Sequence, residues 1–199
     1  MLKEIISQAA DDKYIENDSY EGQVLLKIDL SGYEFKDVHF ASCIFSDCDF
    51  TKASFYNSSF TNCDFSNCVF ANSYFRETQI VDCKGDGANF TSSHFKQSVI
   101  KSSTFHYAYF TQSVFDMSLF DSCIMRSVFF NEIKLNKTKF VDVDFQGADF
   151  FKTLLKGVDL SNCVISGISV SDTMSELKGV TINPVQALDI VQMLSVKVK

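Results

Sequence analysis

The segment CIFSDCDFTKASFYNSSFTNCDFSNCVFANSYF, residues 43–75, holds phenylalanine at every fifth position from Phe45 to Phe75. A period of five matches neither the 3.6-residue turn of an α-helix nor the two-residue alternation of a flat strand. Each unit of five residues must therefore form a short extended segment and then a corner. Four corners close a square, so the pattern predicts coils of four units with the phenylalanines inside.

The same spacing continues on both sides of this segment without insertion, over thirty units between Leu25 and Val170. Phenylalanine or an aliphatic residue fills the central positions, and Gly85 interrupts them. Residues twenty apart then stack, and thirty units make about 7.5 coils in a rod of roughly 36 Å. Such a solenoid leaves unpaired strand edges only at its two ends, which must be capped.

A second inward position lies two residues before each central one and holds small or β-branched residues. All seven cysteines occupy it: Cys43, Cys48, Cys63, Cys68, Cys83, Cys123 and Cys163. Stacked coils point their Cβ atoms in parallel, which suits neither a disulfide dihedral nor tetrahedral zinc ligands. We therefore expect reduced thiols in the core and no metal site.

These features, seen in ASCIFSDCDF (residues 41–50) and TNCDFSNCVF (residues 61–70), resemble the pentapeptide-repeat family. The resemblance covers about three quarters of the chain. It implies an all-β solenoid, a right-handed quadrilateral β-helix with twenty residues per coil.

The two ends differ from the repeat. We expect an N-terminal cap over residues 1–24, in which Leu2, Ile5, Ile6 and Ala9 have helical spacing, and the β-helix over 25–175. Residues 176–199 are expected to form a C-terminal helix, capped by Asn183 with Pro184 in its first turn, and a strand from Val196 to Val198. The helix is apolar over most of its surface, which predicts a dimerisation module with the contact residues Val185, Leu188, Val191 and Leu194.

The tail ELKGVTINPVQALDIVQMLSVKV (residues 176–198) and the segment QIVDCKGDGANF (residues 79–90) are similar to the Qnr-type fluoroquinolone-resistance pentapeptide proteins. This resemblance implies a homodimer and a DNA-like rod that binds bacterial DNA gyrase or topoisomerase IV in place of DNA. The Qnr members that protect gyrase carry projecting loops, for which the register between 25 and 170 leaves no room. The alternative is a structural interaction scaffold for another protein partner, without gyrase activity.

The net charge of −7 opposes direct nucleic-acid binding. Between 25 and 170 there are 16 acids and 13 bases, whereas a duplex of about 36 Å carries about 21 charges. Mimicry would require acids gathered on particular faces. Asp29, Asp49 and Asp149 share one face and Asp64 and Asp144 the next, which makes them the candidate acidic surface. They could equally serve only to solvate the rod, and Lys134, Lys137 and Lys139 lie together near the later coils.

Other residues offer a contact surface but no chemistry. Tyr109 and Phe129 occupy outward positions on one face with Phe151 beyond them, so they could contact a partner or be covered by the dimer or the tail. The three histidines share no face and no nucleophile–base pair has a recognisable spacing, so we expect no catalytic residue, no cofactor and no enzyme activity. The first residues indicate neither a secretory signal nor a membrane span, which predicts a cytoplasmic protein.

Overall fold

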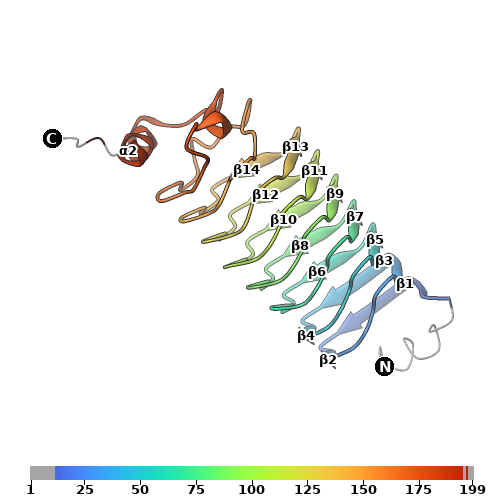
Figure 1. The fold of residues 1–199 in the computed structure, drawn as a ribbon. Coiled ribbons are helices and arrows are strands. Elements are labelled where there is room, and N and C mark those ends of the chain that lie inside the picture. Colours follow the sequence, from blue (N-terminus) through green and yellow to red (C-terminus); the bar gives the residue numbers. More distant parts are fainter. Residues whose placement is uncertain (1–11, 195, 197–199) are drawn as a thin grey trace.

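The computed structural model describes residues 12–194 and residue 196. They form a right-handed quadrilateral β-helix followed by one α-helix, and all strands pair in parallel (Figure 1). One face carries β1 (Tyr14–Glu21), β3 (Glu34–Ala41), β5 (Ser54–Tyr56), β7 (Tyr74–Arg76), β9 (His94–Lys96), β11 (Val114–Asp116) and β13 (Lys134–Asn136). The adjacent face, onto which β3 also extends, carries β6 (Ser59–Thr61), β8 (Gln79–Val81), β10 (Val99–Lys101), β12 (Leu119–Asp121) and β14 (Lys139–Val141).

The remaining two faces are built mainly from isolated parallel bridges. The pair β2 (Val24–Leu26) and β4 (Ile44–Ser46) begins one of them. On the other, bridges join partners twenty residues apart without a gap from Asp29 to Ser169. The predicted repeat, with its twenty-residue coil and its absence of insertions, is confirmed over this range.

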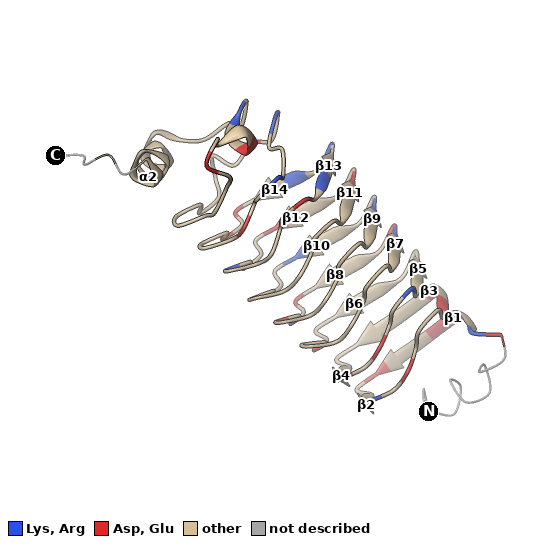
Figure 2. Cartoon of the chain, viewed as in Figure 1, with Lys and Arg blue, Asp and Glu red and all other residues tan. Residues whose placement is uncertain are grey.

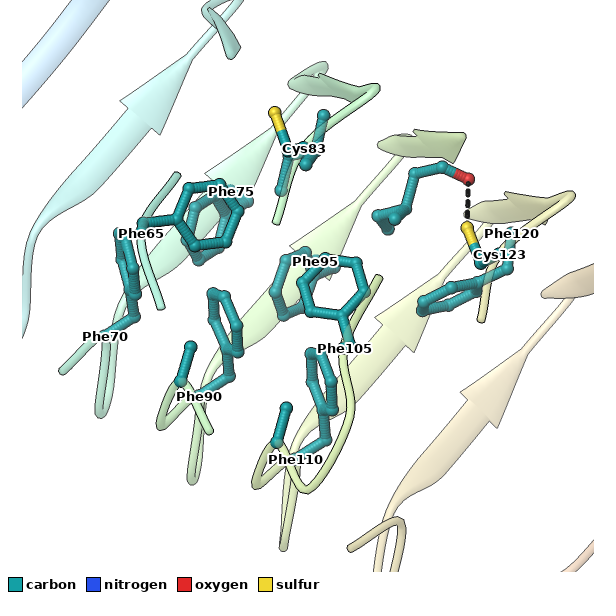
Figure 3. Close-up of a cluster of buried hydrophobic side chains, with 14 of the residues drawn as sticks. Phe65, Phe70, Phe75, Cys83, Phe90, Phe95, Phe105, Phe110, Phe120 and Cys123 are labelled. Carbon is teal, nitrogen blue, oxygen red and sulfur yellow. Dashed lines mark hydrogen bonds between the residues drawn. The ribbon is translucent and has the colours of Figure 1, made fainter. Parts of the chain in front are cut away.

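Stacked phenylalanines fill the interior. The rings of Phe50 and Phe70 lie 4.6 Å apart at 2°, and those of Phe75 and Phe95 lie 4.4 Å apart at 2°. Neighbouring faces of the square meet edge to face, as for Phe65 and Phe70 (Figure 3). Both arrangements suit the aromatic quadrupole, so each ring is stabilised by contacts along the rod and across it.

The second inward ladder satisfies the backbone at the corners. Ser98 accepts a hydrogen bond from the Thr78 amide at 3.4 Å, and its hydroxyl donates to the Phe75 carbonyl at 3.3 Å. The Cys123 thiol donates to the Ile100 carbonyl at 3.4 Å in the same manner (Figure 3). All seven cysteines are buried and free. Burial raises the pKa of Cys123 to about 11, so this thiol keeps its proton at neutral pH.

The residue two positions after a central one turns the corner in the left-handed region in nearly every unit, and Asn162 is an exception. Asn57 (φ 46°) and Asn62 (φ 54°) are examples, and glycine occupies several equivalent positions. Asparagine tolerates this conformation better than most residues. In most coils the amide of this residue then donates to the next coil, as Asn57 does to the Arg76 carbonyl at 2.9 Å.

Gly85 interrupts the sequence pattern without leaving an empty space. A Cβ atom at this position would lie 2.6 Å from Cε2 of Phe65 and 2.7 Å from Cε1 of Phe105. The rings above and below therefore lean into the space that a central side chain would fill. The missing side chain is compensated by its two neighbours in the stack.

The expected N-terminal boundary was wrong. Residues 14–21, assigned to a cap over residues 1–24, form β1, which pairs with β3 from Tyr14 to Glu21. Ile15 and Tyr20 continue the five-residue register below Leu25 and are buried. The Tyr20 hydroxyl reaches Asp18 at 2.7 Å, so a tyrosine can occupy a central position at the end of the rod. The helical segment expected at Leu2–Ala9 lies outside the described residues.

The C-terminal end is closed by a 3₁₀ turn, η1 (Ser175–Leu177), and by α2 (Pro184–Met193). Asn183 caps α2 as expected, and it forms a capping box with Gln186. Residues 176–181 pair with the last coil, where the Leu155 amide donates to the Glu176 carbonyl at 2.9 Å. Most of the strand expected at Val196–Val198 lies outside the described residues.

We expect Phe105→Ala to lower the free energy of unfolding by about 3 to 5 kcal/mol, because it removes a fully buried ring and leaves a cavity next to Gly85. Denaturant unfolding measures this. The matched control is Phe151→Ala, whose ring is 40% exposed. Equal stability of the Phe105 variant and the native protein would contradict the inward assignment.

Candidate partner-binding faces

Asp29 and Asp49 lie on adjacent rungs of one face, as the sequence predicts. Their backbones form a parallel bridge, and each carboxylate accepts a hydrogen bond at 2.8 Å from the amide two residues later. Hydrogen bonds from Ser31 lower the pKa of Asp29, so it stays charged at neutral pH. Asp149 shares this face but is separated from the first two by Val69, Asn89, Tyr109 and Phe129.

Asp64 and Asp144 share the next face, again as predicted, but basic residues accompany them. Lys84 follows Asp64 on the next rung, and the Asp144 carboxylate forms an ion pair with Arg126 at 2.7 Å. Opposite charges this close largely cancel at a distance. The five candidate aspartates therefore lie on two faces but form no continuous acidic stripe.

These aspartates also have a structural role that does not depend on charge. Each carboxylate holds the amide two residues later and so shapes the start of a corner, as Asp64 does with Ser66 at 2.9 Å. At the equivalent position of another coil, the side-chain oxygen of Asn89 accepts from the Thr91 amide at 2.9 Å. Asparagine can thus replace aspartate in this role, which separates the charge from the fold.

The aromatic candidates do form a surface. The rings of Tyr109 and Phe129 stack at 4.6 Å and 3°, and Tyr109 and Phe151 are 43% and 40% exposed. A groove of about 500 Å³ lies between Phe129, Phe151 and Tyr107. The described part of the C-terminal tail leaves these rings exposed.

The outer side of α2 is mostly apolar, although Gln192 is also exposed, and its inner side is partly polar. Gln186 is buried and donates to the carbonyls of Leu160 and Cys163 at 2.8 and 2.6 Å, which caps the last coil. Among the predicted contact residues, Val185 is 73%, Leu188 47% and Leu194 59% exposed, whereas Val191 is half-buried. Sequence periodicity could not have assigned Gln186 to the inner side, because a polar residue ordinarily faces solvent.

Lys134, Lys137 and Lys139 gather on β13, β14 and the corner between them, near the C-terminal end of the rod (Figure 2). The histidines stay apart: His39 hydrogen-bonds to Ser59, and His94 packs edge-on against Tyr74. Within residues 12–194 and 196, no three His, Cys, Asp or Glu side chains group as metal ligands would. In that same part of the chain, no helix has the length and apolar character needed to cross a membrane.

Two family models match the chain, one described as pentapeptide repeat region over residues 33–110 and one as pentapeptide repeats (8 copies) over residues 120–167. Together they cover more than half of its length. Two trypsin-treated variants of QnrB1, described as a plasmid-mediated fluoroquinolone resistance protein, are similar in structure, with TM-scores of 0.62 and 0.58 at 20% identity. Both alignments cover 94% of this chain and 98% or 97% of the other. No curated protein matches in sequence, and at this identity the structural likeness concerns the fold.

We expect Gln186→Ala to release α2 from the coil end, at a cost of about 1 to 3 kcal/mol, because two buried carbonyls lose their donor. Hydrogen exchange of the α2 amides should become faster while that of the central coils is unchanged. Gln192→Ala, an exposed glutamine of the same helix, is the control and should have no effect. Unchanged α2 exchange in the Gln186 variant would contradict the capping role.

Proposed function

This chain belongs to the pentapeptide-repeat family, and from that premise we propose that it is a DNA-mimicking protein that binds a bacterial type II topoisomerase, DNA gyrase. The observation that carries the proposal is the pairing of Asp29 and Asp49 on adjacent rungs of a straight, insertion-free rod. The likeness of the fold to QnrB1 and the Qnr-like tail sequence support the same partner. Topoisomerase IV is the related candidate.

The acidic residues most suited to such a role lie in the N-terminal half. Asp29 and Asp49 occupy one face and Asp64 the neighbouring one, and β1 adds Asp18 and Glu21 at the end of the rod, whereas its Glu16 is paired with Lys36. The later coils are less suited, because Asp144 is paired with Arg126 and β13 and β14 carry lysines. We therefore assign the DNA-like part of the surface to the first half of the rod.

We further propose that the chain is a homodimer held together by residues 176–199, the C-terminal module. The outer side of α2 exposes Val185, Leu188 and Leu194, while its inner side is occupied by the coil end. A second copy would bury this apolar surface and extend the rod in both directions. The protein then acts in the cytoplasm as a rod with two acidic ends.

A scaffold without gyrase activity is the second candidate, and the aromatic surface of Tyr109, Phe129 and Phe151 favours it. Stacked, rigid rings such as Tyr109 and Phe129 lose little conformational entropy on binding, and aromatic residues are enriched at protein interfaces. Binding through this aromatic surface would not depend on any resemblance to DNA. It therefore offers a separate place for a protein partner.

The dimer is tested by Leu188→Asp combined with Val191→Asp. Light scattering at micromolar concentration should give a dimer for the native chain and a monomer for the double variant, because two buried carboxylates would lose their hydration. Val24→Asp with Val164→Asp, on exposed positions of the coil, is the matched control and should remain dimeric. A native chain that is monomeric at this concentration would contradict the proposal that residues 176–199 hold two chains together.

The function is tested by the supercoiling activity of a bacterial gyrase. We expect the native protein to inhibit supercoiling, and the triple variant Asp29→Asn, Asp49→Asn and Asp64→Asn to inhibit less, more clearly at low salt. Asparagine keeps the corner hydrogen bonds, as Asn89 does, so the change is one of charge. Quinolone protection should be weak or absent.

The control for this experiment removes the same number of charges elsewhere. Glu34→Gln, Asp37→Asn and Asp116→Asn lie on β3 and β11, away from the two assigned faces, and should inhibit like the native protein. If gyrase supercoils normally in the presence of the native protein at concentrations well above that of DNA, gyrase binding is rejected. The scaffold function would then be the remaining proposal. Equal loss of inhibition in both triple variants would reject the assigned faces.

A further inference from the structure

The coils separate along one seam near the C-terminal end of the rod. One rung earlier, the amides of Lys134 and Lys139 donate to the carbonyls of Ser113 and Ser118 at 2.9 Å. The equivalent amides of the next rung, Leu154 and Asp159, form no such bond with any described residue. The outer edges of β13 and β14 therefore remain unpaired in the described structure.

Backbone hydrogen bonds are missing for amide donors on both sides of the seam. The amides of Met117 and Ser122 donate to the carbonyls of Asn136 and Val141 at 2.8 and 2.9 Å. Within the described chain, the amides of Lys137 and Asp142 have no such acceptor on the following coil. The other two faces remain closed, since the Phe130 amide donates to Asp149 at 2.8 Å and the Phe145 amide to Val164 at 2.8 Å.

Two grooves follow the seam, one on each of the two open faces. The first, of about 470 Å³, is lined by Glu132–Leu135 on one side and by Lys152 and Leu154 on the other. The second, of about 370 Å³, lies between residues 138–141 and residues 157–162. Leu135 is only partly buried here, whereas Phe115 one rung earlier is fully buried. Two side-chain contacts cross the seam, an ion pair of Lys152 with Glu132 at 3.4 Å and a hydrogen bond from the Ile133 amide to the Thr153 hydroxyl at 3.1 Å. Along β13 and β14 the seam is open, and backbone groups without partners among the described residues lie on both of its walls.

We propose that this seam is a second binding site, which takes an extended acidic segment of a partner protein by strand addition to β13 and β14. Strand addition supplies the missing backbone hydrogen bonds and places alternate side chains toward the groove. The site is separate from the acidic faces assigned above, so its existence does not depend on gyrase binding.

Three lysines at the seam favour an occupant with negative charge. Lys134 and Lys139 lie on the two edge strands and Lys137 at the corner, and among the described residues none of the three forms an ion pair. Elsewhere this molecule pairs opposite charges between stacked rungs, as in Lys36 with Glu16 and in Lys101 with Asp121 at 3.1 Å. The groove walls also carry two acids, Asp159 and the Glu132 that is paired with Lys152, but with Lys134, Lys137 and Lys139 the site remains net positive. An occupant with carboxylates beside these lysines would complete the same arrangement.

The same lysines argue against self-association at this edge. A second copy that paired β13 and β14 with its own would oppose lysine to lysine, and edge lysines are a common protection against such pairing. The C-terminal residues SVKVK are basic as well. The occupant that fits the charge of this edge is therefore an acidic segment of another protein.

The pairing of β1 with β3 defines the length and pattern of the occupant. β1 follows β3 over eight residues and around one corner, with Ile15 and Tyr20 directed inward and Asn17 left-handed at φ 54°. Lys137 holds the same place between β13 and β14 and has φ 50°. We therefore expect about eight residues, apolar at the second and seventh positions, with asparagine, aspartate or glycine at the fourth.

Hydrogen exchange tests the seam in the free protein. The amides of Lys137, Asp142, Leu154 and Asp159 should exchange at least about tenfold faster than their counterparts one rung earlier, Met117, Ser122, Lys134 and Lys139, because they have no backbone acceptor. Equal protection of the two sets would show a closed seam and overturn the proposal.

Peptide binding tests the occupant. The probe is a synthetic peptide with the sequence of β1, YIENDSYE, which has the required pattern and three acids. It should bind the full chain, slow the exchange of the seam amides, and bind roughly tenfold more weakly to Lys134→Glu with Lys139→Glu. Lys84→Glu with Lys96→Glu, on rungs paired at both sides, should bind the probe like the native chain.

Two further peptides separate strand addition from charge attraction. A peptide with lysine at the three acidic positions should not bind, and a scrambled peptide of the same composition should bind much more weakly. Equal binding of the scrambled peptide, or binding of a single-stranded oligonucleotide with the same protection of the seam, would show a general polyanion patch. Either result overturns the proposal, as does native-like binding of the probe to Lys134→Glu with Lys139→Glu.

Discussion

The whole structure depends on the requirement that each five-residue unit direct one side chain inward while its backbone bonds to the units above and below. Backbone hydrogen bonds set the distance between rungs at about 4.8 Å. Rings at this spacing can stack face to face, as Phe75 and Phe95 do at 4.4 Å. The inward positions are therefore narrowly constrained, and the outward ones are left free to vary. Binding functions therefore belong to the outward positions, to the two ends, and to places where the backbone bonds between rungs are missing.

The repeat itself could be predicted because the constraint recurs in every unit. Register, inward ladders and coil size all follow from the spacing of Phe45, Phe50 and their equivalents. The N-terminal limit was misplaced because Tyr20 and Ile15 satisfy the same constraint with other side chains. The role of Gln186 was beyond prediction, since it depends on carbonyls that only the end of the coil leaves open. The seam could not be predicted either. Leu155 and Leu160 keep the five-residue register, although the backbone hydrogen bonds between rungs are missing on two faces there.

The candidate aspartates illustrate how one residue type can meet two requirements. Asp29, Asp49 and Asp64 each hold an amide at a corner, which explains their position in the repeat without reference to a partner. Asn89 performs the same task without charge. The choice of aspartate over asparagine at a given corner is therefore free of structural constraint and available to selection by a partner. Sequence spacing could place these residues on faces, but it could not separate the two requirements.

The outward residues change in character along the rod, and this gradient bears on how a dimer would meet a partner. Residues 14–73 carry nine acids and three bases, the aromatic pair Tyr109 and Phe129 lies in the later coils, and lysines occupy the edge at β13 and β14 (Figure 2). Two chains joined through α2 would place lysines on both sides of the centre and acids at the two outer ends. A duplex has uniform charge along its length, so such a dimer resembles DNA only in its outer parts. A partner that binds DNA would then contact the outer coils, while the central aromatic and basic surfaces remain open to other proteins.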